Sequence, residues 1–185
     1  MKSITEIYDK AYADKYRVLA ETELGKRIYA ERWKLIEKYC HGEMTLLDFG
    51  CGPGAFHQSG TNGFKTMGYD VNPECGFSHF PTNKVEIMTM WDSIEHLTEP
   101  FWPINFYKPK WLFISTPNLD SVKNFMAWKH RRPGEHLWYF TFASLDKLLD
   151  NIGYEVLEYN FDEGGLRDPE CPEAIITVVA RRRDQ

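Results

Sequence analysis

Three glycines and two carboxylates lie close together in the first half of the sequence. The stretch 46–56 reads LLDFGCGPGAF, in which a short apolar run ends on Asp48 and glycines follow at positions 50, 52 and 54. Glycine reaches backbone conformations closed to other residues and lets a ligand approach the main chain. Asp70 ends the next apolar segment, about 20 residues on, where an acid can bind the two hydroxyls of a ribose. The spacing predicts a site for a nucleotide-like molecule.

Two cofactors fit this pattern. Gly50-x-Gly52-x-x-Ala55 formally satisfies the dinucleotide fingerprint, in which a pyrophosphate rests on a helix N-terminus. Asp48, however, would face that anionic pyrophosphate at short range. S-adenosylmethionine carries an amine, a sulfonium and a ribose diol but no phosphate. The position of Asp48 therefore favours S-adenosylmethionine as the cofactor.

The same stretches resemble a known family. LLDFGCGPG resembles the first motif of class I S-adenosylmethionine-dependent methyltransferases, and GYDVNP resembles their second motif. MWDSIEHL is similar to the fourth motif of the branch that contains the ubiquinone-biosynthesis O-methyltransferases, and the similarity runs from residue 44 to residue 160. The resemblance implies a set of cofactor-binding residues, namely Asp48, Phe49, Gly50, Cys51, Gly52, Gly54, Asp70, Val71, Trp91 and Asp92.

Histidines supply the candidates for catalysis. Methyl transfer from a sulfonium is an in-line displacement, and a hydroxyl acceptor needs a base near neutral pH. In related enzymes the Glu-His pair of the fourth motif lies beside the acceptor, which makes His96 the candidate base and Glu95 its orienting partner. His136 is a second candidate. The alternatives are a packing or capping role for His96 and a loop position bonded to backbone for His136. In some relatives the residue that corresponds to Glu95 helps to hold a divalent metal. A mechanism without a metal is favoured, so no metal ligands are expected.

The expected function is transfer of a methyl group from S-adenosylmethionine to a small-molecule acceptor, with oxygen favoured over nitrogen or carbon. Two other functions stay open. An NAD-dependent oxidoreductase would need a second substrate-binding region, for which 185 residues leave little room. A catalytically silent, cofactor-binding partner domain is supported by the short stretch after Asp70.

The elements that must position these residues are expected to form one domain over 1–185. Residues 1–42 are expected to be an N-terminal helical segment, in which Gly25 separates two helices. Residues 43–185 alternate helices with short apolar strands, which predicts an α/β, Rossmann-like three-layer sandwich around a mostly parallel sheet. The segment 72–84 is too short for the family's usual helix and strand, so about six strands are expected.

The sequence also predicts the secondary structure of three segments toward the C-terminus. Residues 121–128 are expected to form a short helix, and residues 141–151 an amphipathic helix with a hydroxyl at its start and Gly153 just past its end. A Gly-Pro-rich loop at 163–173 then separates the last two strands. Because no crossover helix fits between these strands, they are predicted to pair antiparallel.

The composition of the chain limits the classes of partner that the protein is expected to bind. The formal net charge is −5, which disfavours nucleic acid because phosphate binding needs clustered Lys and Arg. The cysteines are scattered without a Cys-x-x-Cys pair, which argues against a zinc site or disulfides. No apolar run approaches the length of about 20 residues that spans a bilayer, and the N-terminus lacks the apolar core of a signal peptide. A cytoplasmic protein with a small-molecule acceptor and no membrane partner is expected, and a homodimer is allowed.

Overall fold

The computed structural model describes residues 9–60 and 63–183. Residues 1–8, 61–62 and 184–185 lie outside this description, and with them the first residues of the predicted N-terminal helical segment. No helix within the described ranges is both long enough and apolar enough to cross a membrane.

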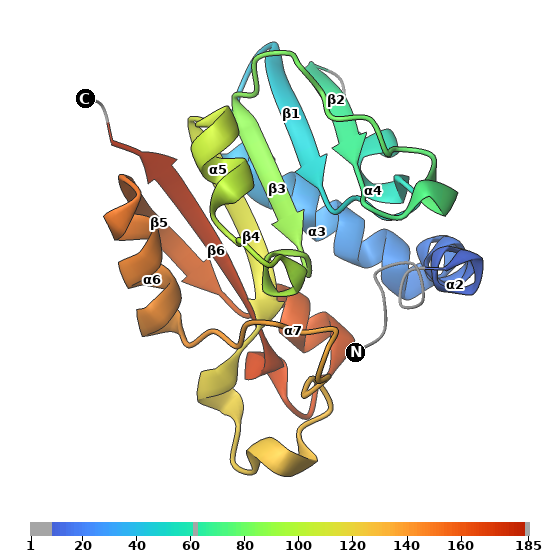
Figure 1. Ribbon diagram of the computed structural model, residues 1–185, viewed down its shortest axis with the longest axis vertical. Helices are drawn as coiled ribbons and strands as arrows, with labels where there is room; N and C mark the ends of the chain where they lie inside the picture. The colour runs from blue at the N-terminus through green and yellow to red at the C-terminus, as the bar shows by residue number, and fades with distance from the viewer. Residues whose placement is uncertain (1–8, 61–62, 184–185) are drawn as a thin grey trace.

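A single six-stranded sheet forms the centre of the molecule, in the order β2-β1-β3-β4-β6-β5 (Figure 1). Strands β1 to β4 pair parallel, and β6 pairs antiparallel with both β4 and β5. The prediction of a mostly parallel sheet of about six strands with an antiparallel C-terminal strand is confirmed. The strands are β1 (Met44–Phe49), β2 (Phe64–Tyr69), β3 (Ile87–Trp91), β4 (Trp111–Pro117), β5 (Tyr154–Asn160) and β6 (Ile175–Arg182).

Helices cover both faces of the sheet, which gives the predicted three layers (Figure 1). On one face, Trp33 and Ile36 of α3 pack against strand residues such as Leu46 and Phe113. On the other, residues of α5 and α6 share a core with Met88 of β3. Every residue of β3 and β4 is buried, as expected for central strands covered on both sides. The helices are α2 (Lys10–Glu21), α3 (Glu23–Tyr39), α4 (Ala55–Gln58), α5 (Trp102–Tyr107), α6 (Phe142–Asn151) and α7 (Asp162–Arg167).

The predicted helix at 141–151 is confirmed, and two neighbouring expectations need correction. Thr141 caps α6 through a reciprocal capping box with Ser144. Residues 121–128 do not form one helix: 3₁₀ turns occupy 119–121 and 125–127, because Asn118 and Asn124 accept hydrogen bonds from the backbone two residues on. The expected loop 163–173 begins within α7, where Gly164 lets the helix lie against the carbonyl of Pro172.

The break between the first two described helices lies at Thr22 and not at Gly25. The Thr22 side chain accepts a hydrogen bond from the Gly25 N–H and so caps α3. Gly25 lies in the first turn of α3, where a Cβ atom would come within 2.3 Å of the Leu19 carbonyl oxygen. Glycine is therefore required here for the close approach of two helix ends.

Gly25→Ala tests this steric role, because helix propensity alone predicts that Ala stabilises a helix by about 1 kcal/mol. Crowding against backbone typically costs about 1–3 kcal/mol, and the 2.3 Å approach to a backbone oxygen places Gly25 at the upper end of this range. After subtraction of the propensity gain, we expect a net loss of about 1–2 kcal/mol in the free energy of unfolding, measured by urea denaturation. Gly165→Ala in α7 is the matched control, since its Cβ would lie 3.7 Å from Pro172 in ordinary contact. An unchanged or raised stability in Gly25→Ala would contradict the steric argument.

Candidate functional site

A cavity of about 530 Å³ lies at the carboxyl ends of β1, β2 and β3, where open parallel sheets bind their ligands. Helices α2 and α3 also contribute to its wall. All the site residues expected from the sequence line this cavity except Gly54. The sheet therefore brings together residues that are up to 88 positions apart, from Asp48 to His136 (136 − 48 = 88).

The glycine loop after β1 has left-handed backbone at each of its three glycines. At Gly50 a Cβ atom would lie 2.4 Å from Cβ of Ser93, so a side chain is excluded by packing. At Gly52, with φ of 53°, nothing lies within 4 Å of the Cβ position. The main chain at Gly52 is half-buried but open on this side, so a ligand can approach it. Gly54 packs against the Phe77 ring outside the cavity.

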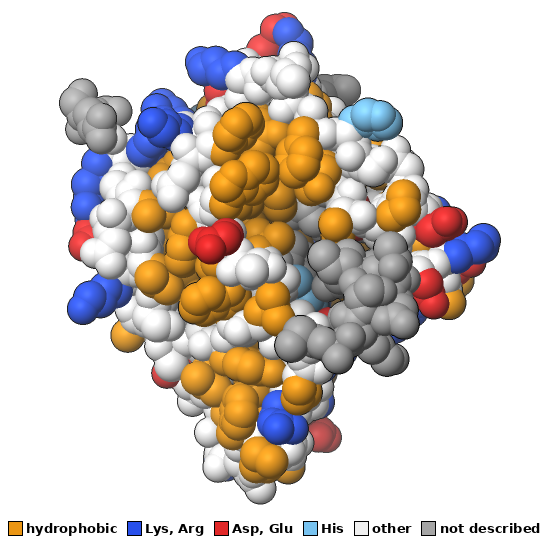
Figure 2. Space-filling view, in the orientation of Figure 1, with side chains coloured by type: hydrophobic (Ala, Val, Ile, Leu, Met, Phe, Trp, Pro, Cys, Tyr) orange, Lys and Arg blue, Asp and Glu red, His pale blue; other side chains and the backbone are white. Residues whose placement is uncertain are grey.

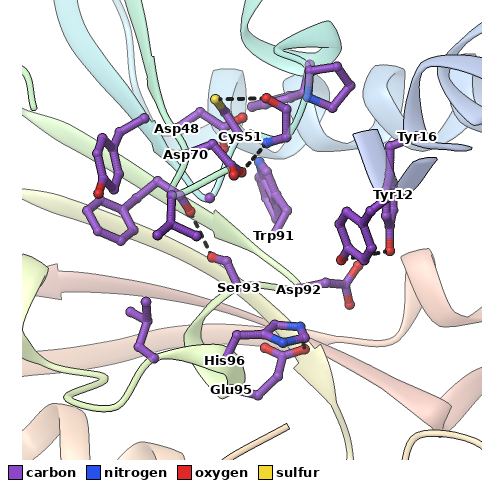
Figure 3. A pocket seen from close by; sticks show the side chains of 18 of the residues that line it. Tyr12, Tyr16, Asp48, Cys51, Asp70, Trp91, Asp92, Ser93, Glu95 and His96 are labelled. Carbon is purple, nitrogen blue, oxygen red and sulfur yellow. Dashed lines mark hydrogen bonds and ion pairs between the residues drawn. The ribbon is translucent and has the colours of Figure 1, made fainter. Parts of the chain in front are cut away.

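Asp70 is tied directly to this loop. Its Oδ2 accepts a hydrogen bond from the Gly52 N–H at 2.7 Å (Figure 3). Its Oδ1 accepts one from the Asn72 N–H at 2.8 Å. Burial raises the pKa of the Asp70 carboxyl. Each carboxylate oxygen keeps a second lone pair, so Asp70 has acceptors left for two hydroxyls. Val71, the next residue, is exposed at the cavity edge.

Asp48 is buried behind the glycine loop. Its Oδ1 accepts a hydrogen bond from the Thr89 hydroxyl at 2.7 Å, and burial raises the pKa of the carboxyl to about 7. Its Oδ2 lies 3.9 Å from Nδ1 of His57, a buried histidine whose pKa burial lowers to about 4. His57 was not anticipated from the sequence, and its place one turn after the glycines in α4 is the signal that could have found it. Burial raises the pKa of the Cys51 thiol, so it stays protonated.

Trp91 and Asp92 lie at the end of β3 beside two arginines that sequence reasoning missed. Arg167 donates to Asp92 and to Glu163, and Arg32 binds both Glu163 carboxylate oxygens at 2.6 and 2.9 Å. Burial raises the pKa of Asp92, but the charges of Arg167 and Arg32 outweigh it and leave the pKa lowered. The Asp92 carboxylate is thus engaged by the chain's own cations. The Arg32 guanidinium also lies 4.6 Å from the Trp91 ring centroid.

The three catalytic candidates meet across the cavity from the glycine loop. Glu95 is buried; its Oε2 accepts from the Thr116 hydroxyl at 3.1 Å, and its Oε1 lies 3.9 Å from Nε2 of His96. The His96 and His136 rings meet edge to face with centroids 4.6 Å apart. Nδ1 of His96 lies 3.0 Å from the carbonyl oxygen of Glu135. Glu95, His96 and His136 offer three ligand atoms within 4.8 Å of one another, so they form a group that can hold a metal ion.

Aromatic side chains form an apolar edge of the cavity. Phe80, from the irregular segment after Asp70, stacks on Tyr69 with centroids 3.9 Å apart and meets Trp102 of α5 at 5.4 Å. Figure 2 shows hydrophobic side chains gathered over α5, and both Phe80 and Trp102 are 45% exposed. Exposed aromatic side chains of this kind can pack against a flat ring.

Solved structures with the same fold include methyltransferases. One chain of the complex between the Haloferax volcanii Trm112 methyltransferase activator and the putative methyltransferase has a TM-score of 0.71, 14% identity and 99% coverage of both chains. Magnesium protoporphyrin IX methyltransferase (ChlM) from Synechocystis PCC 6803, with bound SAH, has a TM-score of 0.65 and 12% identity, over 97% of this chain and 98% of that chain. These identities support a common fold only.

The small RNA methyltransferase HEN1 has a TM-score of 0.61 and 20% identity, over 86% of this chain and 25% of that chain. The present chain thus spans about a quarter of HEN1. No curated protein matches the sequence. Residues 19–159 match the family model for the methyltransferase domain. This match covers most of the chain, so the protein belongs to this family and is a class I S-adenosylmethionine-dependent methyltransferase.

Arg167→Met should destabilise the protein, because it leaves Glu163 and Asp92 to share Arg32 alone. Removing one member of a buried ion network costs about 3–5 kcal/mol, and the 29% exposure of the Arg167 and Asp92 side chains reduces this, so we expect about 2 kcal/mol by urea denaturation. Lys10→Met, which breaks an exposed pair with Asp14, is the control and should leave the denaturation midpoint unchanged. Equal midpoints for the two variants would show that the network contributes no stability.

Proposed function

We propose that the protein transfers the methyl group of S-adenosylmethionine to an oxygen atom of a small-molecule acceptor. The supporting observation is the arrangement of the cavity. The glycine loop and Asp70 lie on one side, Glu95 and His96 lie on the other, and Trp91 lies between them (Figure 3). A donor held on the first side presents its methyl group to an acceptor on the second. The whole chain, 1–185, acts as one domain in this proposal.

In this proposal the cofactor is bound on the side of the cavity formed by the glycine loop and Asp70. The ribose diol donates to the Asp70 carboxylate, which the Gly52 N–H holds in place. The amine lies toward Asp48, whose carboxyl loses its proton more readily beside a cation. The backbone from Phe49 to Pro53 lies along the methionine part, and the adenine packs on the apolar edge formed by Val71, Phe80 and Trp102.

The reaction at the second side begins with loss of the acceptor's proton. Nδ1 of His96 faces a carbonyl oxygen, which only accepts hydrogen bonds, so Nδ1 carries the ring proton and Nε2 carries the lone pair. In this mechanism, which uses no metal, the Nε2 lone pair takes the proton of the acceptor hydroxyl. The oxygen then forms a bond to the methyl carbon, the S–CH₃ bond breaks, and its electron pair stays on sulfur to give S-adenosylhomocysteine. The hydrogen bond to the Glu135 carbonyl and the edge-to-face contact with the His136 ring orient His96, and Glu95 Oε1 lies 3.9 Å from its Nε2.

The size of the cavity limits the acceptor, because about 530 Å³ must hold both the cofactor and the acceptor. The resemblance to the ubiquinone-biosynthesis O-methyltransferases supports oxygen as the atom that is methylated. HEN1 is a small RNA methyltransferase, but the net charge of −5 favours a small molecule over RNA here.

Cofactor choice is tested by thermal unfolding with S-adenosylmethionine, S-adenosylhomocysteine, NAD or no ligand. A ligand at about 100 times its Kd adds about 2.7 kcal/mol of stability, so the first two compounds should raise Tm and NAD should not. Asp70→Asn, which keeps the shape of the side chain, should weaken S-adenosylmethionine binding at least about tenfold through loss of acceptors to the ribose. Glu74→Gln, an exposed neighbour, is the control. A Tm shift with NAD alone would overturn the proposal.

His96→Ala should lower kcat by about 10²–10⁴, the usual contribution of proton transfer by a positioned side chain, and should leave the Kd of S-adenosylmethionine within about twofold. The measurement is methyl transfer over a panel of phenols and alcohols, with Kd followed by calorimetry. His41→Ala is the control, because this exposed histidine precedes β1 at the opposite edge of the sheet. Full turnover in His96→Ala would remove this residue from the mechanism.

A further inference from the structure

A buried histidine, His57, lies behind the glycine loop next to the acid toward which the cofactor's amine is directed. Its side chain does not line the cavity, yet Nδ1 of its ring lies 3.9 Å from Oδ2 of Asp48. We propose that His57 is a positioning residue for cofactor binding: its Nδ1–H donates to Asp48 and stabilises the charged carboxylate that binds the amine. This inference rests on the proposed function and adds to it a residue that does not touch the cofactor.

Asp48 has room for a second hydrogen-bond donor. The residue is 2% exposed, and among the described residues only the Thr89 hydroxyl is bonded to its carboxyl group, at Oδ1. Burying a carboxylate with one neutral donor is costly, which agrees with a pKa that burial raises to about 7. A donor at Oδ2 reduces this cost, because a hydrogen bond to the charged form of an acid favours that form.

His57 lacks an acceptor at the same place. The residue is 5% exposed, and its Nδ1 has no hydrogen-bond partner within the described ranges. Burial lowers its pKa to about 4, so the imidazole is neutral near pH 7 and carries one ring proton. A lone pair on Nδ1 would be repelled by Asp48 Oδ2, whereas an N–H is attracted to it, so the proton is on Nδ1. A hydrogen bond needs about 2.7–3.2 Å, so the two atoms must approach by about 1 Å when Asp48 is charged.

Two glycines hold the imidazole beside Asp48. Gly68 pairs with Asp48 across β2 and β1. A Cβ atom at Gly68 would lie 2.3 Å from Cε1 of His57 and 2.9 Å from its Nδ1, so the ring occupies the space of the missing side chain. A Cβ atom at Gly54 would lie 2.9 Å from the same Cε1, and the Phe77 ring meets the imidazole edge to face with centroids 4.8 Å apart. This packing keeps Nδ1 next to the carboxylate.

The described part of the chain also places four other titratable groups near Asp48. Arg32 of α3 attracts the charge of Asp48, and Asp70 at the end of β2 repels it. Burial raises the pKa of the Cys51 thiol and of the Tyr29 phenol, so both stay protonated near neutral pH. These groups are the same in every variant of the histidine. A difference between such variants therefore reports the contact of the imidazole with Asp48.

The cofactor meets this pair of side chains through its amine. A carboxylate oxygen carries two lone pairs, so Asp48 Oδ2 can accept from His57 and from the cofactor's ammonium group at the same time. The ammonium group binds the ionised form of Asp48, so cofactor affinity rises as the pH rises through the pKa of about 7 of the free carboxyl. Removing the Nδ1–H raises this pKa. Affinity is then lost below the new pKa and kept above it.

Two variants of nearly equal shape isolate the hydrogen bond. His57→Asn keeps an N–H group close to the position of Nδ1, and His57→Leu replaces it with a methyl group. The titration of Asp48 is followed in the full-length chain without cofactor by ¹³C NMR of its carboxyl carbon. A hydrogen bond to a charged group is worth about one pKa unit, so His57→Leu should raise the pKa of Asp48 by about one unit and His57→Asn by less. An unchanged pKa in His57→Leu, or equal shifts in the two variants, overturns the inference.

The unsubstituted chain provides a test that needs no variant to fold. ¹⁵N NMR of the histidine side chains should show the ring proton of His57 on Nδ1, and its proton resonance should move downfield as Asp48 ionises. A ring proton on Nε2 overturns the inference.

Binding of S-adenosylhomocysteine separates this inference from the proposed function. It is measured by calorimetry from about pH 6 to about pH 9, and the ligand's own amine titrates identically in all measurements. His57→Leu should bind about tenfold more weakly than the unsubstituted chain near pH 6 and within about twofold near pH 9, where Asp48 is ionised in both. A loss that is equal at every pH shows a purely structural role and overturns the inference. Absence of binding by the unsubstituted chain overturns the proposed function, whereas the NMR titration still decides the role of His57.

Discussion

The loop after β1 is held on the end of β2 by three main-chain donors, and the cofactor side of the cavity depends on this contact. The N–H groups of Gly50 and Cys51 donate to the Tyr69 carbonyl, and the Gly52 N–H donates to Asp70. The parallel pairing of β1 and β2 places these groups at the same edge. One set of hydrogen bonds thus fixes both the open main chain and the acid, so neither has to reorganise when a ligand binds.

Buried ions fix the opposite wall. Arg32 from α3 and Arg167 from α7 meet Glu163 and Asp92 at the end of β3. Desolvation makes such a network a modest source of stability, but its geometry is specific because each charge has a defined partner. Asp92 has left-handed backbone with φ of 50°, which a non-glycine residue adopts at a cost. The arginines hold this turn, and the turn leads directly into the segment that carries Glu95 and His96.

Local sequence patterns were sufficient to predict the strands and one side of the cavity. Short apolar runs predicted the strands, and the glycines and acids after them predicted one side of the cavity. Contacts between distant residues were not predictable: Arg32 and Glu163 are 131 positions apart, and no spacing rule joins them. The lack of a hydrogen-bond partner at Glu95 Oε1 and His136 Nδ1 among the described residues was equally hidden, because burial defines both features. Local competition by Asn118 and Asn124 explains why one predicted helix became two short turns.

The short segment 72–84 after Asp70 contributes an aromatic side chain and a backbone hydrogen-bond acceptor to the site. In place of a regular helix it supplies Phe80, which stacks on Tyr69, and its Pro81 carbonyl accepts a hydrogen bond from Tyr107 of α5. These contacts draw α5 and Trp102 to the same edge of the cavity. The aromatic edge is thus anchored to β2 and α5 although the segment itself is irregular. The site therefore depends on loops whose positions are set by a few tertiary contacts. For this reason the composition and periodicity of the sequence identify the fold better than they identify the methyl acceptor.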